Sequence, residues 1–369
     1  MSQSKLTTKI YLFLIFLFST LFLNGIDLKT EKKIRLIEDK TNIISNISRF
    51  TVGKNEEIII PDGKTSEIKV FSANGNLEYT IGRKGRGPGE FIDPYCCFIN
   101  DEALWISDLR GFKISEFKFD KNAYKYTKDI RLSNICTDIK VKHNILFIAG
   151  YITGNQGAYA LYSKDLKNSY KIEYLLTNEL KYGYTSNKKK QFLKDYRERK
   201  NFSSFNLSGY FDIYKNNIYF VWPADMRIIK INIKDKSTKI FGHKTNNYIK
   251  PFVSKELIEA TRNRDSAAIR ELKKNMSFIG GIFVTPKFVG LIYRGKYNNS
   301  LKGCPVFIQF YTHKGKYLEE TVIKDAIGDI YFDHPFHYSQ DKSKLYFLNK
   351  KEIQDNDNDN IYEILVFGL

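Results

Sequence analysis

The sequence contains few of the residues that build disulfide-stapled or metal-bound proteins. Its 369 residues include 4 cysteines and 5 histidines. The cysteines, Cys96, Cys97, Cys136 and Cys304, form no C-x-x-C pair, and this excludes the common zinc-finger and redox spacings. Cys96 and Cys136 lie in apolar, strand-like runs, where a thiol usually serves as a small hydrophobic side chain. A disulfide stays open as an alternative in an oxidising compartment.

Proline and familiar catalytic motifs are also scarce. The chain has only 8 prolines and no long low-complexity tract, which argues against extended disorder, and 42% hydrophobic residues supply ample material for a core. It has no G-x-S-x-G and no H-E-x-x-H, so the signatures of common serine hydrolases and zinc proteases are missing. No cofactor is therefore predicted, although a divalent metal held in a central channel stays an alternative.

Acidic residues are outnumbered by basic ones. The chain carries 59 Lys and Arg against 41 Asp and Glu, for a formal net charge of +18. This balance favours anionic partners electrostatically. The alternative is that the basic residues are scattered over a solvated surface and have no specific partner, because most of them are interspersed along the sequence.

The first residues indicate the compartment. Lys5 and Lys9 precede one uninterrupted apolar run, Ile10 to Leu23, which is short for a membrane span. We expect residues 1–25 to be a signal peptide, with an uncleaved N-terminal anchor as the alternative. No cysteine follows the run, so lipid attachment is not indicated. The prediction is an exported protein, periplasmic or secreted, that contacts the membrane only through this segment. Export also argues against a nucleic-acid partner.

From residue 48 onward the sequence repeats one pattern. A short strand, a polar turn and a strongly apolar strand are followed by a third alternating strand, and often by a fourth. Six copies of a four-stranded antiparallel unit predict an all-β fold, a six-bladed β-propeller over residues 33–369. The six leading hairpins lie at residues 49–60, 96–106, 138–148, 211–221, 282–292 and 336–348.

The last copy lacks a fourth strand, and three further segments lie outside the repeat. We expect Lys33 to Asp39 to supply the missing strand and close the ring. Two helical insertions are predicted near residues 178–204 and 246–277. Within them, residues 188–200 form a basic helix, and one helix runs from Ser254, an N-cap candidate, to Met276 with an apolar stripe. Each helix either packs on the propeller or serves as a lid or docking element.

The repeat resembles a known family. The segment I-S-D-L-R-G-F-K-I-S-E-F (106–117) is similar to the NHL-repeat consensus, with weaker copies at 60–71 and 221–231. The run G-R-K-G-R-G-P-G-E-F-I-D-P (82–94) is similar to the linker between blades in NHL-type and bacterial six-bladed β-propeller proteins. The resemblance implies the fold and not an activity, because such propellers include binding modules as well as metal-dependent lyases and lactonases.

The glycine-rich run itself has two interpretations. A phosphate-binding loop requires Gly-x-x-x-x-Gly-Lys-Ser/Thr followed by a helix, whereas in this run Gly89 is followed by Glu90 and Phe91 with no helix signal. We therefore expect a structural linker in which Gly85, Gly87 and Gly89 adopt unusual dihedral angles, Pro88 fixes one of them, and Phe91 anchors the linker in the core. The basic residues beside the glycines, including Arg86, offer donors to an anionic ligand at the same place.

Two other motifs contain groups that bind metals. His334 and His337 form the one close histidine pair and enter the first strand of the last blade, which lines the channel of a propeller. With Asp333 they form a potential metal or acid–base site, or else they are ordinary core histidines. The run Asp355 to Asn360 has the alternating oxygens of a calcium loop. It lacks the loop's glycine and final glutamate, so a solvated hairpin is favoured.

Topology predicts a binding face. In a four-stranded blade, the loops between second and third strands lie on the same face as the links between blades. That face should carry the glycine linker, both insertions, the 355–360 loop and the loop of Asp225, and long insertions usually mark the binding face. The predicted function is an exported non-enzymatic scaffold for an unidentified protein, peptide or glycan. The alternative is a metal-dependent lyase or lactonase-like hydrolase at the channel mouth. The predicted ligand-binding residues are Arg86, Asp93, Tyr95, Asp225, Arg227, His334 and His337.

Overall fold

The computed structural model describes residues 26, 28–37, 44–45, 47, 49–100, 103–152, 158–167, 172–177, 209–223, 225–252, 254–328, 336–339, 341–352 and 360–369. Three predictions lie outside these residues: the leader at 1–25, the insertion near 178–204 with its basic helix, and the 355–360 loop up to residue 359. His334 lies outside them as well. No helix within the described ranges is long and apolar enough to cross a membrane.

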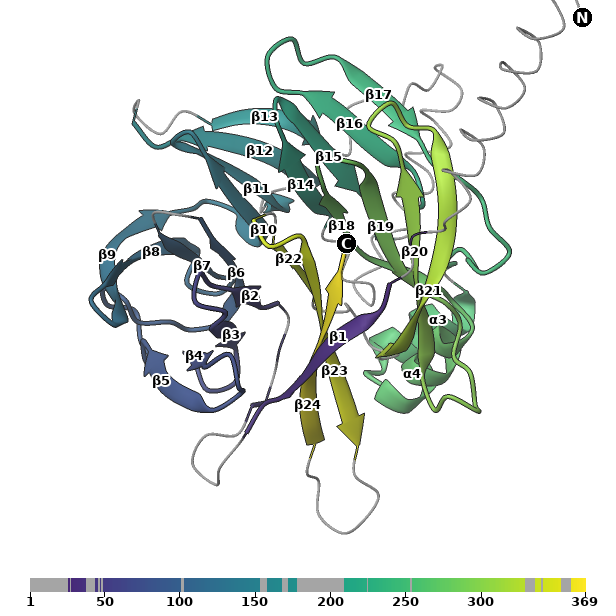
Figure 1. The fold of residues 1–369 in the computed structure, drawn as a ribbon, viewed down its shortest axis with the longest axis horizontal. Coiled ribbons are helices and arrows are strands. Elements are labelled where there is room, and N and C mark those ends of the chain that lie inside the picture. The colour runs from purple at the N-terminus through teal and green to yellow at the C-terminus, as the bar shows by residue number, and fades with distance from the viewer. Residues whose placement is uncertain are drawn as a thin grey trace, which may run out of the picture.

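The strands form six antiparallel sheets of four, arranged as the blades of a propeller around a central channel (Figure 1). The predicted six-bladed β-propeller is therefore confirmed. Blades are numbered here in chain order. Blade 1 comprises β2 (Thr51–Val52), β3 (Ile58–Asp62), β4 (Glu67–Phe71) and β5 (Leu77–Ile81); blade 2 comprises β6 (Pro94–Ile99), β7 (Leu104–Asp108), β8 (Lys113–Asp120) and β9 (Ala123–Arg131); blade 3 comprises β10 (Ile135–Lys142), β11 (Ile145–Ile152), β12 (Ala158–Asp165) and β13 (Ile172–Thr177).

The second half of the ring follows the same order. In every blade the first strand lies innermost, and each strand pairs with the one before it. Blade 4 comprises β14 (Tyr210–Tyr214), β15 (Asn217–Val221), β16 (Ile228–Asn232) and β17 (Thr238–Phe241); blade 5 comprises β18 (Phe278–Val284), β19 (Val289–Arg294), β20 (Cys304–Tyr311) and β21 (Tyr317–Gly328); blade 6 comprises β22 (Phe336–Ser339), β23 (Lys344–Glu352), β24 (Asn360–Gly368) and β1 (Thr30–Arg35).

The N-terminal strand closes the ring, as predicted. β1 pairs antiparallel with β24, with Ile34 opposite Ile364, so blade 6 is built from both ends of the described chain (Figure 1). The strand occupies Thr30–Arg35, not the predicted 33–39. Leu36 still donates its N–H to Tyr362 O of β24 at 2.9 Å, but Ile37 leaves this edge and donates its N–H to Gly75 O in blade 1 at 2.8 Å, so the strand ends early.

The hydrophobic core lies between the blades. One cluster of buried side chains fills each of the six interfaces between neighbouring blades, including the interface where blade 6 meets blade 1. The second strand is buried on both faces because it is stacked between two sheets, as all five residues of β3 and of β7 show. The sequence pattern of strongly apolar second strands follows from this stacking.

The insertion after blade 4 contains two helices where one was predicted. α3 (Lys255–Arg262) begins at the predicted N-cap Ser254, whose side chain accepts the Leu257 N–H at 3.2 Å. The chain then breaks at Arg264, which has a left-handed φ of 54°, and α4 (Ser266–Lys274) begins after Asp265. Asp265 Oδ1 accepts the Ala268 N–H at 3.0 Å and so caps the start of a second helix, where the sequence predicted one continuous helix. Leu257 and Met276 are buried together between the helices.

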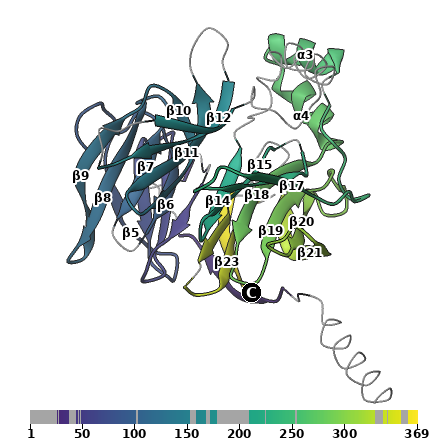
Figure 2. The ribbon, with the colours of Figure 1, turned by 90° about the horizontal axis from the view of Figure 1, so that it is seen from above.

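The strand order gives the propeller two distinct faces. We call the face with the links between blades and the loops between second and third strands the link face. The opposite face, with the turns between first and second and between third and fourth strands, is the hairpin face. The glycine linker, α3 with α4, and the loop of Asp225 share the link face, as predicted for these three elements, and Figure 2 shows both helices standing out on one side.

Candidate functional site

The glycine-rich run is a link between blades 1 and 2. Phe91 is fully buried, as predicted for an anchor. Gly82 and Gly89 have positive φ values of 77° and 69°, whereas Gly85 and Gly87 do not, so the predicted unusual dihedrals hold for Gly89 and are wrong for the other two. At Gly85 the reason for glycine is space: a Cβ there would lie 2.1 Å from Glu90 Oε2.

The linker therefore holds a carboxylate of its own chain. Glu90 Oε2 accepts the Gly87 N–H at 2.8 Å, and Arg83 Nε donates to Glu90 Oε1 at 2.8 Å. The Gly87 N–H, followed by the Arg83 side chain, lowers the pKa of Glu90. Arg86 is exposed on the same run. Glu90 thus takes the Gly87 N–H and the Arg83 side chain, two donors that an anionic ligand at this linker would use.

Asp93 belongs to the attachment of this linker to blade 2. Buried Asp108, at the end of β7, accepts three backbone N–H groups, from Ile92 at 2.8 Å, Asp93 at 2.9 Å and Gly111 at 2.9 Å. Asp93 itself receives Arg110 Nε at 3.1 Å, while partial burial raises its pKa. Tyr95 packs against the core between blades 2 and 3.

The same arrangement recurs in blade 1. Asp62, fully buried at the end of β3, accepts the N–H of Ser45 from the preceding link at 2.9 Å and that of Lys64 from its own turn at 3.0 Å. The aspartate of the I-P-D and I-S-D segments thus ties an incoming link to the loop between second and third strands. This explains the repeated aspartate by backbone hydrogen bonding rather than by ligand recognition.

Asp225 and Arg227 form a local pair in blade 4. Arg227 Nε lies 2.8 Å from Asp225 Oδ2 and 3.0 Å from Oδ1, and the Arg227 N–H also donates to Oδ1 at 3.1 Å. These two residues lie two blades away from Asp93 in the ring. The predicted ligand-binding residues of the link face are therefore distributed over separate local pairs, and a shared role for them stays a prediction.

His337 lies on β22, the innermost strand of blade 6, as predicted for a channel residue. Its Nδ1 is 3.3 Å from Thr51 Oγ1 in blade 1. Burial, with the nearby positive charge of Lys140, lowers the pKa of His337 to about 3. Within the described part of the chain, no three His, Cys, Asp or Glu side chains are grouped to hold a metal ion. The predicted partnership with His334 lies outside the described residues.

Two aspartates link the inner strands around the channel. Asp138 on β10 accepts the Phe211 N–H of β14 at 3.3 Å, and Asp212 on β14 accepts the Val284 N–H of β18 at 2.8 Å. Lys140 Nζ lies 3.8 Å from Asp212 Oδ1, and burial raises the pKa of Asp212. The sequence did not predict this role for either aspartate. Each nevertheless begins an Asp-Ile segment near the start of its predicted hairpin.

One contact crosses the channel. The guanidinium carbon of Arg49, just before β2 in blade 1, lies 4.3 Å from the ring centre of Tyr210, the first residue of β14 in blade 4. These blades are opposite each other in the ring, and Arg49 is 7% exposed. The contact lies at the link-face end of the inner strands, so the titratable channel residues Lys140, Asp212 and His337 lie on its hairpin-face side.

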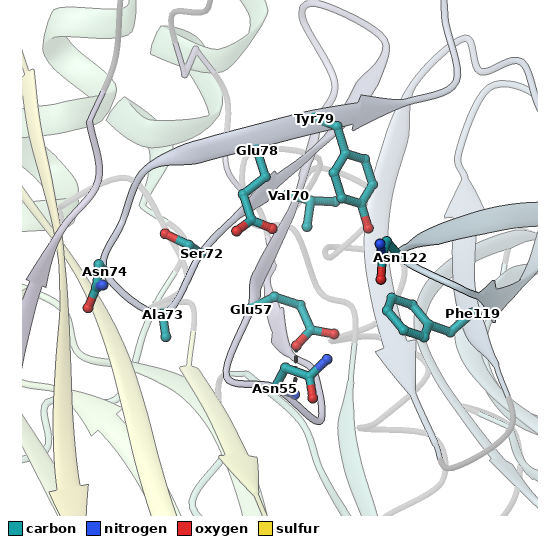
Figure 3. Close-up of a pocket in the computed structure, with 10 residues that line it drawn as sticks. All are labelled: Asn55, Glu57, Val70, Ser72, Ala73, Asn74, Glu78, Tyr79, Phe119 and Asn122. Carbon is teal, nitrogen blue, oxygen red and sulfur yellow. Dashed lines mark hydrogen bonds between the residues drawn. The ribbon is translucent and has the colours of Figure 1, made fainter.

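A pocket of about 500 Å³ opens on the hairpin face between blades 1 and 2 (Figure 3). Carboxylates, amides and a hydroxyl converge on it together with the rings of Phe119 and Tyr79. Figure 3 shows the carboxyl ends of Glu57 and Glu78 directed into the same space. The lining residues are Asn55, Glu57, Val70, Ser72, Ala73, Asn74, Glu78, Tyr79, Phe119 and Asn122.

The pocket was not predicted from the sequence. Its residues come from the β2–β3 and β4–β5 turns, from β4 and β5, and from β8 and the β8–β9 turn of the next blade. In the sequence, residues 72–79 predict only a turn and a fourth strand, and Phe119 belongs to another repeat. The one signal in the sequence was the position of Phe119, a large apolar residue directly before a polar turn. In the structure this side chain is 47% exposed.

These sheets, the ring closed by β1 and a channel lined by first strands define the six-bladed β-propeller class. The chain belongs to the family described as 6-bladed beta-propeller (DUF5128), which matches residues 32–302. This match identifies the propeller family but does not test the resemblance to NHL repeats, which stays a prediction. A comparison with curated proteins found no match.

Solved structures share the fold at low sequence identity. A DUF4221 member from Bacteroides vulgatus has a TM-score of 0.60 and 11% identity, covering 92% of this chain and 97% of its own. A putative exported protein from Bacteroides fragilis has a TM-score of 0.53 and 15% identity, covering 92% and 94%. Virginiamycin B lyase from Staphylococcus aureus, at 12% identity and coverage of 92% and 99%, has a TM-score of 0.48, which carries no argument about activity.

Proposed function

We propose that the protein is an exported, non-enzymatic binding scaffold that recognises a protein, peptide or glycan ligand on one face of the propeller. The observation that carries this proposal is the pocket between blades 1 and 2. A concave site that combines hydrogen-bonding groups with an accessible aromatic ring is the usual form of a ligand site. The pocket lies on the hairpin face, so we assign ligand binding to that face and not to the link face, which the long insertions predicted. Export rests on the charged and apolar pattern of residues 1–25.

The channel supports a scaffold in a second way. The carboxylates of Asp138 and Asp212 each accept a backbone N–H from the next inner strand, and His337 contacts Thr51. Groups that an enzyme needs free for proton transfer are thus used to hold neighbouring blades together. The two aspartates of the channel therefore have a structural role.

The test compares binding by the wild-type protein and a pocket variant. Immobilised panels of glycans and peptides are probed with wild type, with Phe119→Ala/Asn122→Ala, and with Phe252→Ala as the control. Phe252 is 56% exposed and precedes α3 on the link face. We expect at least one ligand to be retained by wild type and control and to lose about tenfold or more in affinity with the pocket variant. Ligands that bind the pocket variant as well as wild type would refute the assignment to this pocket.

The second candidate is a metal-dependent lyase or lactonase-like hydrolase at the channel mouth. The observation that favours it is the convergence of Lys140, Asp212 and His337 from three different blades on the hairpin-face side of the channel. Elemental analysis separates the two candidates. One tightly held divalent ion per chain, lost in a His334→Asn/His337→Asn variant that still folds, would overturn the scaffold proposal.

A further inference from the structure

The pocket between blades 1 and 2 differs in charge from the rest of the molecule. The chain has a net charge of +18, yet the ten pocket residues include two carboxylates, Glu57 and Glu78, and no lysine, arginine or histidine. Among the described residues, neither carboxylate forms an ion pair with a basic side chain. The lining of the pocket is therefore negative on a positive protein, and a basic group also lies against it, the Lys32 ammonium, which donates to Ala73 O at 2.9 Å. At physiological ionic strength, charges farther away than about 8 Å are largely screened, so the two carboxylates and Lys32 set the local charge.

Glu57 is held in place by the fold. It is 8% exposed, its Oε2 accepts the Asn55 N–H at 2.8 Å, and Tyr124 Oη donates to its Oε1 at 2.8 Å. Gly53 makes room for the carboxylate, since a Cβ there would lie 2.0 Å from Glu57 Oε1. The negative charge is thus preorganised, and a ligand does not have to order it. Burial, with a further contribution from the charges of Glu57 and Glu78, raises the pKa of Tyr79, which keeps that phenol neutral.

Aromatic rings form one wall of the same space. Phe119 is 47% exposed at the pocket, and its ring centre lies 5.1 Å from that of Tyr124 in an edge-to-face arrangement. Tyr79 lines the pocket beside it (Figure 3). Aromatic faces attract cations through their quadrupole, and carboxylates give cationic donors short, strong hydrogen bonds. An ammonium or guanidinium group is the ligand chemistry that satisfies both kinds of group at once.

We propose that this pocket binds an organic cation, an ammonium or guanidinium group carried either by a lysine or arginine side chain of a peptide or by a free amine. The proposal rests on the proposed function and names the ligand chemistry of the same site. The amides of Asn55, Asn74 and Asn122 at its edge supply the hydrogen bonds that the rest of such a ligand requires. A neutral saccharide would use these amides and the ring of Phe119 but would leave the two carboxylates without a matching charge.

The experiment compares two probes of nearly equal shape and different charge. Nα-acetyl-arginine amide and Nα-acetyl-citrulline amide are titrated calorimetrically into the purified protein at low and at physiological salt. We expect the arginine probe to bind at least about tenfold more tightly than the citrulline probe, and the difference to shrink as salt rises. Equal affinities, or no binding of either probe, would overturn the proposal.

Matched variants locate the effect. Glu78→Gln removes one charge from an exposed side chain, and Phe119→Ala removes the aromatic wall; Glu259→Gln, exposed on α3 at the link face, is the control for the loss of an acid. We expect each pocket variant to weaken the arginine probe about two- to fivefold and the control to leave it unchanged. An unchanged affinity in Glu78→Gln would refute the role of the pocket carboxylates, since this isosteric change at an exposed site preserves the fold.

Two further arms identify the source of the cation and keep this proposal separate from the broader one. A capped peptide with one internal arginine is compared with n-butylguanidine, a free guanidine of the same single charge: tighter peptide binding assigns the cation to a protein partner, and tighter butylguanidine binding to a small free base. If neither binds, but a glycan or neutral peptide from the panels depends on Phe119, the cation proposal fails and the scaffold proposal stands. If no ligand depends on the pocket, both fail.

Discussion

At the scale of single residues, the surroundings of His337 strongly change its tendency to take up a proton. It faces the channel from β22, contacts Thr51, and lies near the positive charge of Lys140. A protonated imidazole would lose solvation there and gain no nearby carboxylate strong enough to compensate, because Asp341 opposes the shift only in part. The folded protein therefore keeps His337 neutral far below the pH at which an ordinary histidine titrates.

This predicts a pH-dependent term in stability. An unfolded histidine takes up a proton near pH 6.5, whereas folded His337 does so at about 3. Between these values the unfolded state binds more protons, so the free energy of unfolding falls as pH decreases. Relative to His337→Asn, wild type should lose about 1–2 kcal/mol between pH 7 and pH 5 in urea unfolding.

The matched control is His143→Asn, at an exposed turn with φ 50° that asparagine tolerates. We expect this variant to follow wild type at every pH. Parallel pH profiles for wild type and His337→Asn would contradict the assignment of the buried, neutral state to His337.

At the scale of elements, the links between blades are fixed by aspartates rather than by apolar contacts alone. Asp108 binds the glycine linker and the turn after β7 through three N–H groups, and Asp62 does the same for the link into blade 1. Both aspartates end a second strand, where the chain meets the incoming link. The I-P-D and I-S-D segments share an aspartate because both positions make this attachment.

Asp108→Asn tests the attachment. An amide keeps one acceptor oxygen but places an NH₂ group against one of the N–H donors, leaving buried donors unsatisfied. We expect the free energy of unfolding to fall by about 1–3 kcal/mol, and hydrogen exchange to accelerate across residues 83–93. The control is Asp235→Asn, at an exposed turn where the carboxylate accepts the Ser237 N–H at 2.8 Å. This variant should stay within about 0.5 kcal/mol of wild type in free energy of unfolding. Equal stability of the two variants would show that Asp108 has no fastening role.

The elements also show what local sequence can and cannot predict. Runs of strongly apolar residues predict second strands around Ile59, Trp105 and Phe347, and the structure has them there. Burial between two neighbouring blades requires apolar side chains on both faces of these strands. The break between α3 and α4 was missed because Asp265 competes for the Ala268 N–H only once the chain turns at Arg264. The pocket was missed for a different reason: Glu57 and Phe119 meet only through the packing of neighbouring blades.

At the scale of the whole molecule, the closed ring makes every blade a partner of two others. Blade 6 depends on β1, whose Ile34 is 4% exposed and joins the cluster between blades 6 and 1. Without β1, the backbone of β24 would present an unpaired edge, which is a template for association with other strands. Ring closure thus serves both the stability of the fold and its resistance to aggregation.

Ile34→Asp should open this closure. A buried charge replaces an apolar contact, so we expect a loss of about 3 kcal/mol or more in free energy of unfolding. We also expect soluble aggregates in light scattering, because β1 no longer covers β24. Arg35→Thr, on the same strand but exposed, serves as the control and should remain monodisperse. A monodisperse Ile34→Asp protein of wild-type stability would contradict the closing role of β1.

The pairing of β1 with β24 also has a consequence for the time course of folding. Blades 1 to 5 are each built from consecutive strands, and their contacts can form as soon as their own segment is available. Blade 6 brings together residues from opposite ends of the described chain, and such distant contacts form slowly because a long loop must first be closed. We therefore expect blade 6 to form last, and until it forms the molecule is an open arc rather than a ring.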